Sequence, residues 1–226
     1  EIKGKKMNFK IDKKNQFWEI ENEFYHHVHP TRIQKLITHY EAYKKIVDIP
    51  GDIAEFGVLK GCSIIRLAIF RKILENDFSR LIVGFDSFGN FPTTNLSLES
   101  DIKFVKKFSI DAGKSISKEK LDKYLKNKKI ENYELVKGDI FKTVPSFLNK
   151  KSQTRFALIH LDLDCYEPTK FVLESIHTRL VKGAIVLIDD YGAVEGSTLA
   201  IDQFCKENKF RLKFLKHYDR PAYFKM

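Results

Sequence analysis

Acidic residues follow two apolar runs in this chain of 226 residues. Asp162 and Asp164 come directly after the first run, and Asp189 and Asp190 come directly after the second. Short, continuous apolar runs of this kind are typical of strands buried on both faces of a sheet. Three or more carboxylates that meet at one edge of such a sheet would bind a cation, so these residues predict a cation site.

One helix-length stretch separates the two runs. The runs cover residues 156–161 and 184–188, and the stretch between them covers residues 168–180. A strand, a crossover helix and a second strand form a parallel pair, so both groups of acids emerge at the same carboxyl edge. Open α/β sheets bind their ligands at this edge, and the expected fold class is therefore α/β.

A segment with two glycines, residues 54–63, joins an expected strand at 52–56 to the helix that follows. Gly57 and Gly61 allow the backbone to approach a ligand closely, and Ser63 lies near a helix start whose free amides attract an anion. A dinucleotide would require the G-x-G-x-x-G pattern, whereas these glycines are four residues apart. The expected ligand is therefore not NAD.

Two further acids accompany this segment. Glu55 can face an ammonium group while the helix-start amides face a carboxylate, which suits a zwitterionic amino-acid moiety. Asp86 ends an expected strand at 81–85, where a carboxylate can accept both hydroxyls of a ribose. Each of these acids is equally compatible with a solvated strand end.

The length and the hydrophobic content of 43% predict one domain over residues 1–226. Within it we expect an N-terminal helical segment or lid over 1–50 and a basic helical insertion over 90–130. The net charge of +10 lies in the lysine runs 1–14 and 101–130, which leaves the rest of the chain neutral. Nucleic-acid enzymes usually spread basic residues, arginine included, over one face, so no nucleic-acid partner is expected.

The cysteines Cys62, Cys165 and Cys205 are few, scattered and odd in number, which is typical of reduced thiols in a cytosolic protein. The sequence has no apolar stretch long enough to span a bilayer, and its lysine-rich start lacks the apolar core of a signal peptide. We therefore expect a cytoplasmic protein without a membrane partner.

Histidines also need interpretation. His160 lies in an expected strand and is interpreted as a core histidine that has a hydrogen-bond partner. His26, His27 and His29 resemble a metal-binding cluster, but no acid or cysteine stands at a supporting spacing, so they are interpreted as surface or lid.

The remaining patterns predict helices at 31–47, 63–74, 99–128 and 198–207, a strand at 134–137 and a terminal hairpin of 210–215 with 222–225.

Five segments in order resemble the S-adenosylmethionine-dependent O-methyltransferases of the TylF type, which methylate sugar hydroxyls in macrolide and aminocoumarin biosynthesis. The resemblance runs from about residue 21 to residue 203 and implies a Rossmann-like class I methyltransferase fold. That fold has a mostly parallel seven-stranded sheet, a C-terminal antiparallel hairpin and a helical lid, and homo-oligomers are expected. The segments are 55–63, 84–89 with Phe91 and Pro92, 138–145, 160–166, and 188–192 followed by Gly196.

The resemblance also implies a site. S-adenosylmethionine would be the cofactor, and Asp162, Asp189 and Asp190 would hold Mg²⁺. In the wider group of catechol-type enzymes an asparagine stands where Asp190 does, and the lysine base would fall near Cys165, so no base is carried over. The acceptor would be a sugar or a sugar-containing metabolite, with its attachment to a nucleotide left open. The cofactor pocket would include Glu55, Gly57, Ser63, Asp86, Ser87 and Asp139, with Gly61 in the same glycine segment.

Methyl transfer from a sulfonium requires the acceptor oxygen to be held close to the methyl group and made nucleophilic. A bound Mg²⁺ lowers the pKa of a hydroxyl that it coordinates. We predict Asp162 as a metal ligand and candidate base, with Asp164 as the second candidate base, because neighbouring carboxylates raise each other's pKa.

Two other interpretations stay open. Asp162 and Asp164 form a D-x-D pattern, which many glycosyltransferases use to hold a metal, although this leaves the glycine segment and the Asp189-Asp190 pair unexplained. An RNA-directed Rossmann-like methyltransferase or binder would use the lysine runs, and its binding would depend steeply on salt.

Overall fold

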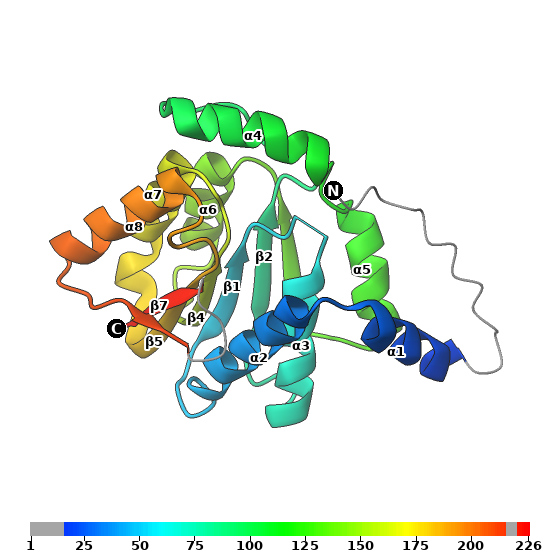
Figure 1. Cartoon of the computed structure of the whole chain (residues 1–226). Helices are drawn as coiled ribbons and strands as arrows, with labels where there is room; N and C mark the ends of the chain where they lie inside the picture. The colour runs from blue at the N-terminus through cyan, green and yellow to red at the C-terminus, as the bar shows by residue number, and fades with distance from the viewer. Residues whose placement is uncertain (1–15, 216–220) are drawn as a thin grey trace.

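The computed structural model describes residues 16–215 and 221–226, and its centre is one seven-stranded sheet (Figure 1). In the order β3-β2-β1-β4-β5-β7-β6, the first five strands run parallel, and β7 is antiparallel to both β5 and β6. The predicted sheet is therefore confirmed. The strands are β1 (Asp52–Phe56), β2 (Ile82–Asp86), β3 (Tyr133–Lys137), β4 (Phe156–Leu161), β5 (Leu180–Ile188), β6 (Lys213–Phe214) and β7 (Ala222–Lys225).

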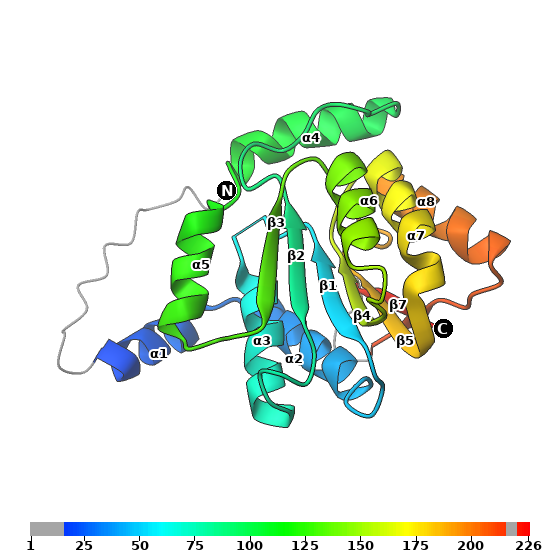
Figure 2. The ribbon, with the colours of Figure 1, turned by 180° about the vertical axis from the view of Figure 1, so that it is seen from behind.

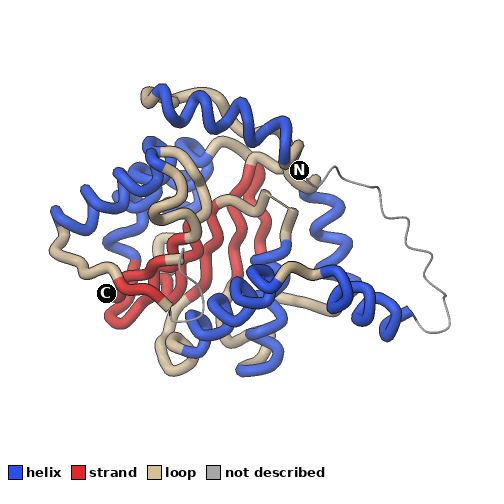
Figure 3. The backbone as a smooth tube through the Cα atoms, in the orientation of Figure 1, coloured by secondary structure: helices blue, strands red, loops and turns tan. Residues whose placement is uncertain are grey.

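Helices cover both faces of the sheet, as the views from the front and from behind show (Figures 2 and 3). The helices α2 (Pro30–Lys44) and α3 (Cys62–Leu74) pack on one face, and α6 (Ile140–Lys150), α7 (Tyr166–Ile176) and α8 (Glu195–Glu207) pack on the other. Each face has its own apolar core, which explains why β4 is buried along its whole length. Among the described helices, none is both long and apolar enough to cross a membrane.

The basic insertion forms two helices between β2 and β3. The first, α4 (Glu99–Asp111), lies across the carboxyl end of the sheet at the top of Figure 1. The second, α5 (Lys118–Asn127), packs against the start of α3: a Cβ atom on Gly61 would lie 2.6 Å from Cδ1 of Leu121. Gly61 also has a φ of +79°, so both the backbone and the packing of α5 require glycine there.

Helix α6 was not predicted. The sequence predicted only a connection between the strands at 134–137 and 156–161. The helix contains Pro145, a residue type that usually interrupts a helix. Asp139 is the N-cap residue of this helix, and its Oδ1 accepts a hydrogen bond from the Phe141 amide at 3.0 Å. The terminal hairpin has the predicted direction, while residues 216–220 between its strands lie outside the described residues.

The remaining differences concern helix ends. Helix α7 begins before Pro168 because proline is tolerated in the first turn, and α8 begins three residues earlier than the pattern predicted. The N-terminal region contains α1 (Gln16–His27), whose last turn holds His26 and His27.

Candidate functional site

A cavity of about 270 Å³ opens at the carboxyl ends of β1, β2, β4 and β5. It lies where the strand order reverses between β1 and β4, the point at which open α/β sheets bind ligands. Asp162, Asp164, Asp189 and Asp190, which follow β4 and β5, all contribute to its wall, as the sequence predicted for a shared edge. Its lining includes the predicted residues Gly57, Asp86, Ser87, Asp139, Asp162, Asp164, Asp189 and Asp190.

Asp162, Asp164 and Asp190 form one group, in which a carboxylate oxygen of each lies within 4.8 Å of the others. Burial and neighbouring carboxylates raise the pKa values of Asp162 and Asp190, and burial followed by the charge of Asp162 raises the pKa of Asp164 to about 7. Oδ2 of Asp190 is buried and has no hydrogen-bond partner among the described residues. The group offers only oxygen donors, and its one nearby cation among the described residues is Nζ of Lys35, 4.0 Å from Oδ2 of Asp162. Such a donor set fits a hard cation such as Mg²⁺.

Asp189 belongs to a different arrangement. Its Oδ2 accepts a hydrogen bond from Nζ of Lys35 on α2, and its Oδ1 lies 3.7 Å from Nε2 of His160. Burial acts to raise the pKa of Asp189, but His160 and Lys35 outweigh it and lower that pKa. The predicted metal trio is therefore divided in the structure, because Asp162 and Asp190 lie with Asp164 while Asp189 pairs with Lys35.

A buried ion pair lies beneath the cavity. Glu55 and His160 are partners in the register of β1 and β4, and Nδ1 of His160 lies 3.1 Å from Oε1 of Glu55. The same oxygen accepts a hydrogen bond from the Ser63 hydroxyl. Burial acts to lower the pKa of His160, but Asp189 and Glu55 raise it to about 10. His160 is thus a partnered core histidine, as predicted, and it joins Glu55 to Asp189.

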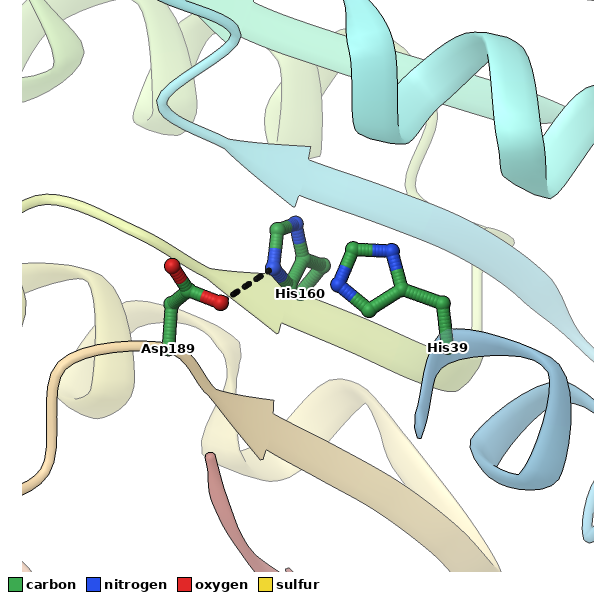
Figure 4. A group of neighbouring side chains, drawn as sticks. All are labelled: His39, His160 and Asp189. Carbon is green, nitrogen blue, oxygen red and sulfur yellow. Dashed lines mark ion pairs between the residues drawn. The ribbon is translucent and has the colours of Figure 1, made fainter. Parts of the chain in front are cut away.

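A second histidine stands beside this pair. The ring of His39 on α2 lies with its centroid 4.8 Å from that of His160, in an edge-to-face arrangement (Figure 4). Neither ring nitrogen of His39 has a hydrogen-bond partner among the described residues, and burial lowers its pKa well below the ordinary value. His39 is therefore held as a neutral ring next to a charged one.

Asp86 holds the glycine segment in shape. Its Oδ2 accepts from the amides of Val58 at 2.8 Å and Leu59 at 2.5 Å, and its Oδ1 accepts from the Phe88 amide at 2.6 Å. Gly57 has a φ of +90°, and a Cβ atom there would lie 1.8 Å from the carbonyl oxygen of Asp162. The glycine is thus required by the close approach of the β1 and β4 ends.

The predicted cofactor residues fall into two sets. Gly57, Asp86, Ser87 and Asp139 face the cavity, whereas Glu55, Gly61 and Ser63 are not among the described residues that line it. The side chains of Glu55 and Ser63 bond to each other behind the segment. This second set supports the first from the core.

Apolar side chains form part of the cavity wall. Phe91, Pro92 and Leu96 come from the loop after β2, and Phe108 comes from α4. The rings of Phe91 and Phe108 meet edge to face with centroids 5.8 Å apart. The cavity lining thus combines an apolar wall with a group of carboxylates.

Sequence reasoning missed Lys35 and His39 as site residues. They are four residues apart on an expected helix and therefore share a face. That spacing was a usable signal, but Asp189, the partner of Lys35, lies 154 residues away in sequence, and no local pattern connects the two. Of the N-terminal histidines, His29 is the N-cap residue of α2, and Nε2 of His27 lies 3.3 Å from Oε2 of Glu23.

Known proteins resemble the chain in sequence and in structure. The family model described as macrocin-O-methyltransferase (TylF) matches residues 5–225. A relative from Streptomyces olivaceus, 8-demethyl-8-(2,3-dimethoxy-alpha-L-rhamnosyl)-tetracenomycin-C 4'-O-methyltransferase, is 29% identical over 148 residues, which are 63% of this chain and 54% of the relative. The chain therefore spans about half the length of that relative.

Two solved methyltransferases share the architecture. CalS11, a calicheamicin methyltransferase, is 28% identical with a TM-score of 0.74, and the match covers 96% of this chain and 87% of that one. CalS11 is described as a TDP-rhamnose 3'-O-methyltransferase. The O-methyltransferase NovP is 20% identical with a TM-score of 0.74 over 85% of this chain and 79% of that one, which supports the fold.

Proposed function

The chain belongs to the macrocin-O-methyltransferase (TylF) family, and on that basis we propose that it transfers a methyl group from S-adenosylmethionine to a hydroxyl of a sugar or of a sugar-containing metabolite. The observation that carries the proposal is the single cavity that joins the glycine segment to the acid group of Asp162, Asp164 and Asp190. A methyl donor and a hydroxyl acceptor need such adjacent subsites.

The cofactor would bind on the side of the cavity formed by Gly57, Asp86, Ser87 and Asp139. Glu55, Gly61 and Ser63 remain predicted cofactor residues, and their positions behind the segment favour a supporting role. The absence of a Cβ atom at Gly57 lets the end of β1 lie against the end of β4, which brings the glycine segment next to Asp162.

The acid group fits Mg²⁺, and Asp162 and Asp190 belong to both the predicted and the observed set of carboxylates. For the third ligand there are two candidates. The resemblance to the family implies Asp189, whereas the group observed in the structure contains Asp164. When bound, Mg²⁺ would polarise the acceptor hydroxyl. The chain's own residues would orient the acceptor and take up its proton.

The proposed reaction balances simply. The acceptor oxygen forms a bond to the methyl carbon, the bond from sulfur to that carbon breaks, and S-adenosylhomocysteine leaves as a neutral thioether. The hydroxyl proton passes to a carboxylate at the cavity wall, for which Asp162 and Asp164 are the candidates. The aromatic wall from α4 and its preceding loop would exclude water from this exchange.

The acceptor class rests on the relatives and on the apolar wall. One relative is named for a rhamnosyl group of tetracenomycin, and CalS11 is described as acting on TDP-rhamnose, so one sugar is carried on an aglycone and the other on a nucleoside diphosphate. Phe91, Pro92 and Phe108 offer a surface against which the ring of an aglycone or of a nucleotide base can stack. We therefore propose a sugar that is carried either on an aglycone or, through a diphosphate, on a nucleoside.

The proposal extends to the domain organisation, the location and the assembly of the protein. We propose one methyltransferase domain over residues 1–226, in a cytoplasmic homo-oligomer without a nucleic-acid partner. Family membership favours methyl transfer over the D-x-D glycosyltransferase alternative, which leaves the glycine side of the cavity without a role.

The test is a turnover assay with purified protein, S-adenosylmethionine, Mg²⁺ and two acceptor panels, TDP-sugars and rhamnosyl aromatic glycosides. Release of S-adenosylhomocysteine together with a methylated sugar in either panel supports the proposal. Turnover with free catechols but with neither sugar panel would contradict it.

A further inference from the structure

Two helices beside the acid group begin without a capping side chain of their own. The N-cap residue of α7 is Cys165 and that of α8 is Val194, and in the described part of the chain neither side chain caps its helix. The first amides of a helix have no partner within the helix, and buried amides need one. Both helix starts are therefore expected to take an acceptor from elsewhere.

Asp101 on α4 reaches both helix starts. Its side chain is fully buried, and its Oδ2 accepts a hydrogen bond from the Tyr166 amide, the first of α7, at 2.7 Å. Its Oδ1 has no hydrogen-bond partner among the described residues but lies against the first turn of α8, where a Cβ atom on Gly196 would lie only 2.1 Å away. A carboxylate at this place is favoured by the positive ends of two helix dipoles. Burial raises the pKa of Asp101, and the amides of Tyr166 and Gly196 oppose that rise.

The same junction carries the acid group. Asp164 lies two residues before Tyr166 with a φ of +62°, and its carbonyl oxygen accepts from the Ser197 amide at 3.1 Å. The carbonyl oxygen of Asp190 accepts from the Val194 amide at 3.2 Å. The turns that hold these two aspartates are thus anchored where α7 and α8 begin.

We propose that Asp101 is a positioning residue for methyl transfer, whose buried carboxylate binds the start of α7, packs against the first turn of α8 and so fixes Asp164 and Asp190 relative to α4. The inference rests on the function proposed above. It also explains Gly196, because only glycine leaves room for the carboxylate in the first turn of α8. Since α4 carries Phe108, the same contact sets the distance between the aromatic wall and the acids.

The first experiment compares Asp101→Asn with Glu99→Gln. Glu99 stands in the first turn of the same helix, but its side chain is 81% exposed and pairs with Lys103 at 2.7 Å, so it is a matched control for charge. Melting temperature, S-adenosylhomocysteine affinity, kcat and acceptor KM are measured for each. We expect Asp101→Asn to stay folded and to lose roughly tenfold to a hundredfold in kcat, with cofactor affinity nearly unchanged. A lower melting temperature with unchanged kcat and KM would overturn the positioning role.

A second experiment requires no acceptor. Hydrogen exchange of the amides at Tyr166 and Ser197 is compared in the parent and in Asp101→Ala, and faster exchange in the variant is expected. Equal exchange would overturn the inference whatever the activity. Absence of turnover in the parent would instead remove the proposed function, so the two failures can be told apart.

A third variant tests the contact from its other side. Gly196→Ala places a methyl group against Asp101 although the backbone there is helical, and it should perturb exchange at Tyr166. In the Asp101→Ala background the obstacle is gone, so the added methyl should have little further effect. Fully additive effects of the two changes would contradict a direct contact.

Discussion

Nδ1 of His160 lies 3.1 Å from Oε1 of Glu55. Both side chains are buried, and the two residues are register partners on the neighbouring strands β4 and β1. The pair does not line the cavity, but it is connected to the cavity wall because Nε2 of His160 lies 3.7 Å from Oδ1 of Asp189. A buried carboxylate that loses its cationic partner is strongly destabilising, typically by about 3–5 kcal/mol.

His160→Leu is therefore expected to lower the free energy of unfolding by about that amount, roughly 3–5 kcal/mol. His39→Leu is the matched control, because His39 is equally buried but its ring nitrogens have no partner among the described residues. Replacing an unpartnered polar ring with an apolar side chain is nearly neutral. Urea unfolding of both variants checks the difference, and equal losses would show that the ion pair contributes nothing.

Lys35 would compete with a bound metal ion for the acids, since its Nζ bonds to Asp189 and lies 4.0 Å from Oδ2 of Asp162. Lys35→Met removes one positive charge from the site and should raise Mg²⁺ affinity by about tenfold, the equivalent of about 1.4 kcal/mol. Calorimetric titration with Mg²⁺ measures this. Lys44→Met, on the same helix and paired with Glu41 at 3.4 Å, should leave the affinity unchanged. Weaker Mg²⁺ binding in Lys35→Met would contradict the competition.

Gly57→Ala should abolish binding of S-adenosylhomocysteine, because the methyl group would force the β1 end away from the Asp162 carbonyl oxygen. Gly113→Ala is the control for backbone conformation. Gly113 also has a positive φ, +64°, but no described atom lies within 4 Å of an added Cβ atom. Strain alone costs about 1–3 kcal/mol at such positions, so both variants lose some stability. Cofactor affinity separates them, and normal binding in Gly57→Ala would show that the close approach is not needed.

Arg71 anchors the segment after α3 through a buried guanidinium. It donates to the carbonyl oxygens of Arg80 at 2.7 Å and Asn132 at 2.8 Å and to Oδ1 of Asp77 at 3.0 Å. Burial acts to raise the pKa of Asp77, but the hydrogen bonds and charges of Lys72 and Arg71 together outweigh it and lower that pKa. Because the folded-state pKa is depressed, the contribution of Asp77 is present above the unfolded pKa and is lost as pH falls through the folded value.

The stability difference between the parent and Asp77→Asn should therefore be largest at neutral pH and should shrink as pH drops below about 4. Urea unfolding at a series of pH values checks this. A stability difference between the two proteins that grows as pH falls would contradict the lowered pKa of Asp77.

The strands were predictable because their apolar runs are short and continuous. The glycine segment was predictable because residue types other than glycine rarely allow the backbone to approach another group so closely. The orientation of the Glu55 side chain was not predictable, because the sequence of a strand that is buried on both faces does not indicate toward which face an acidic side chain points. Helix α6 was not predicted, and it contains Pro145, a residue type that usually interrupts a helix. The contacts of Lys35 with Asp189 and of Asp101 with Tyr166 join residues 154 and 65 positions apart, beyond the reach of any local pattern.

The most direct test of the account is calorimetric titration of S-adenosylhomocysteine into the parent protein and into Asp162→Asn, each with and without Mg²⁺. The account predicts binding in the micromolar range, about −8 kcal/mol, that persists in the variant, together with loss of Mg²⁺ binding in the variant alone. No binding of S-adenosylhomocysteine to the parent under either condition would contradict the proposed methyl transfer.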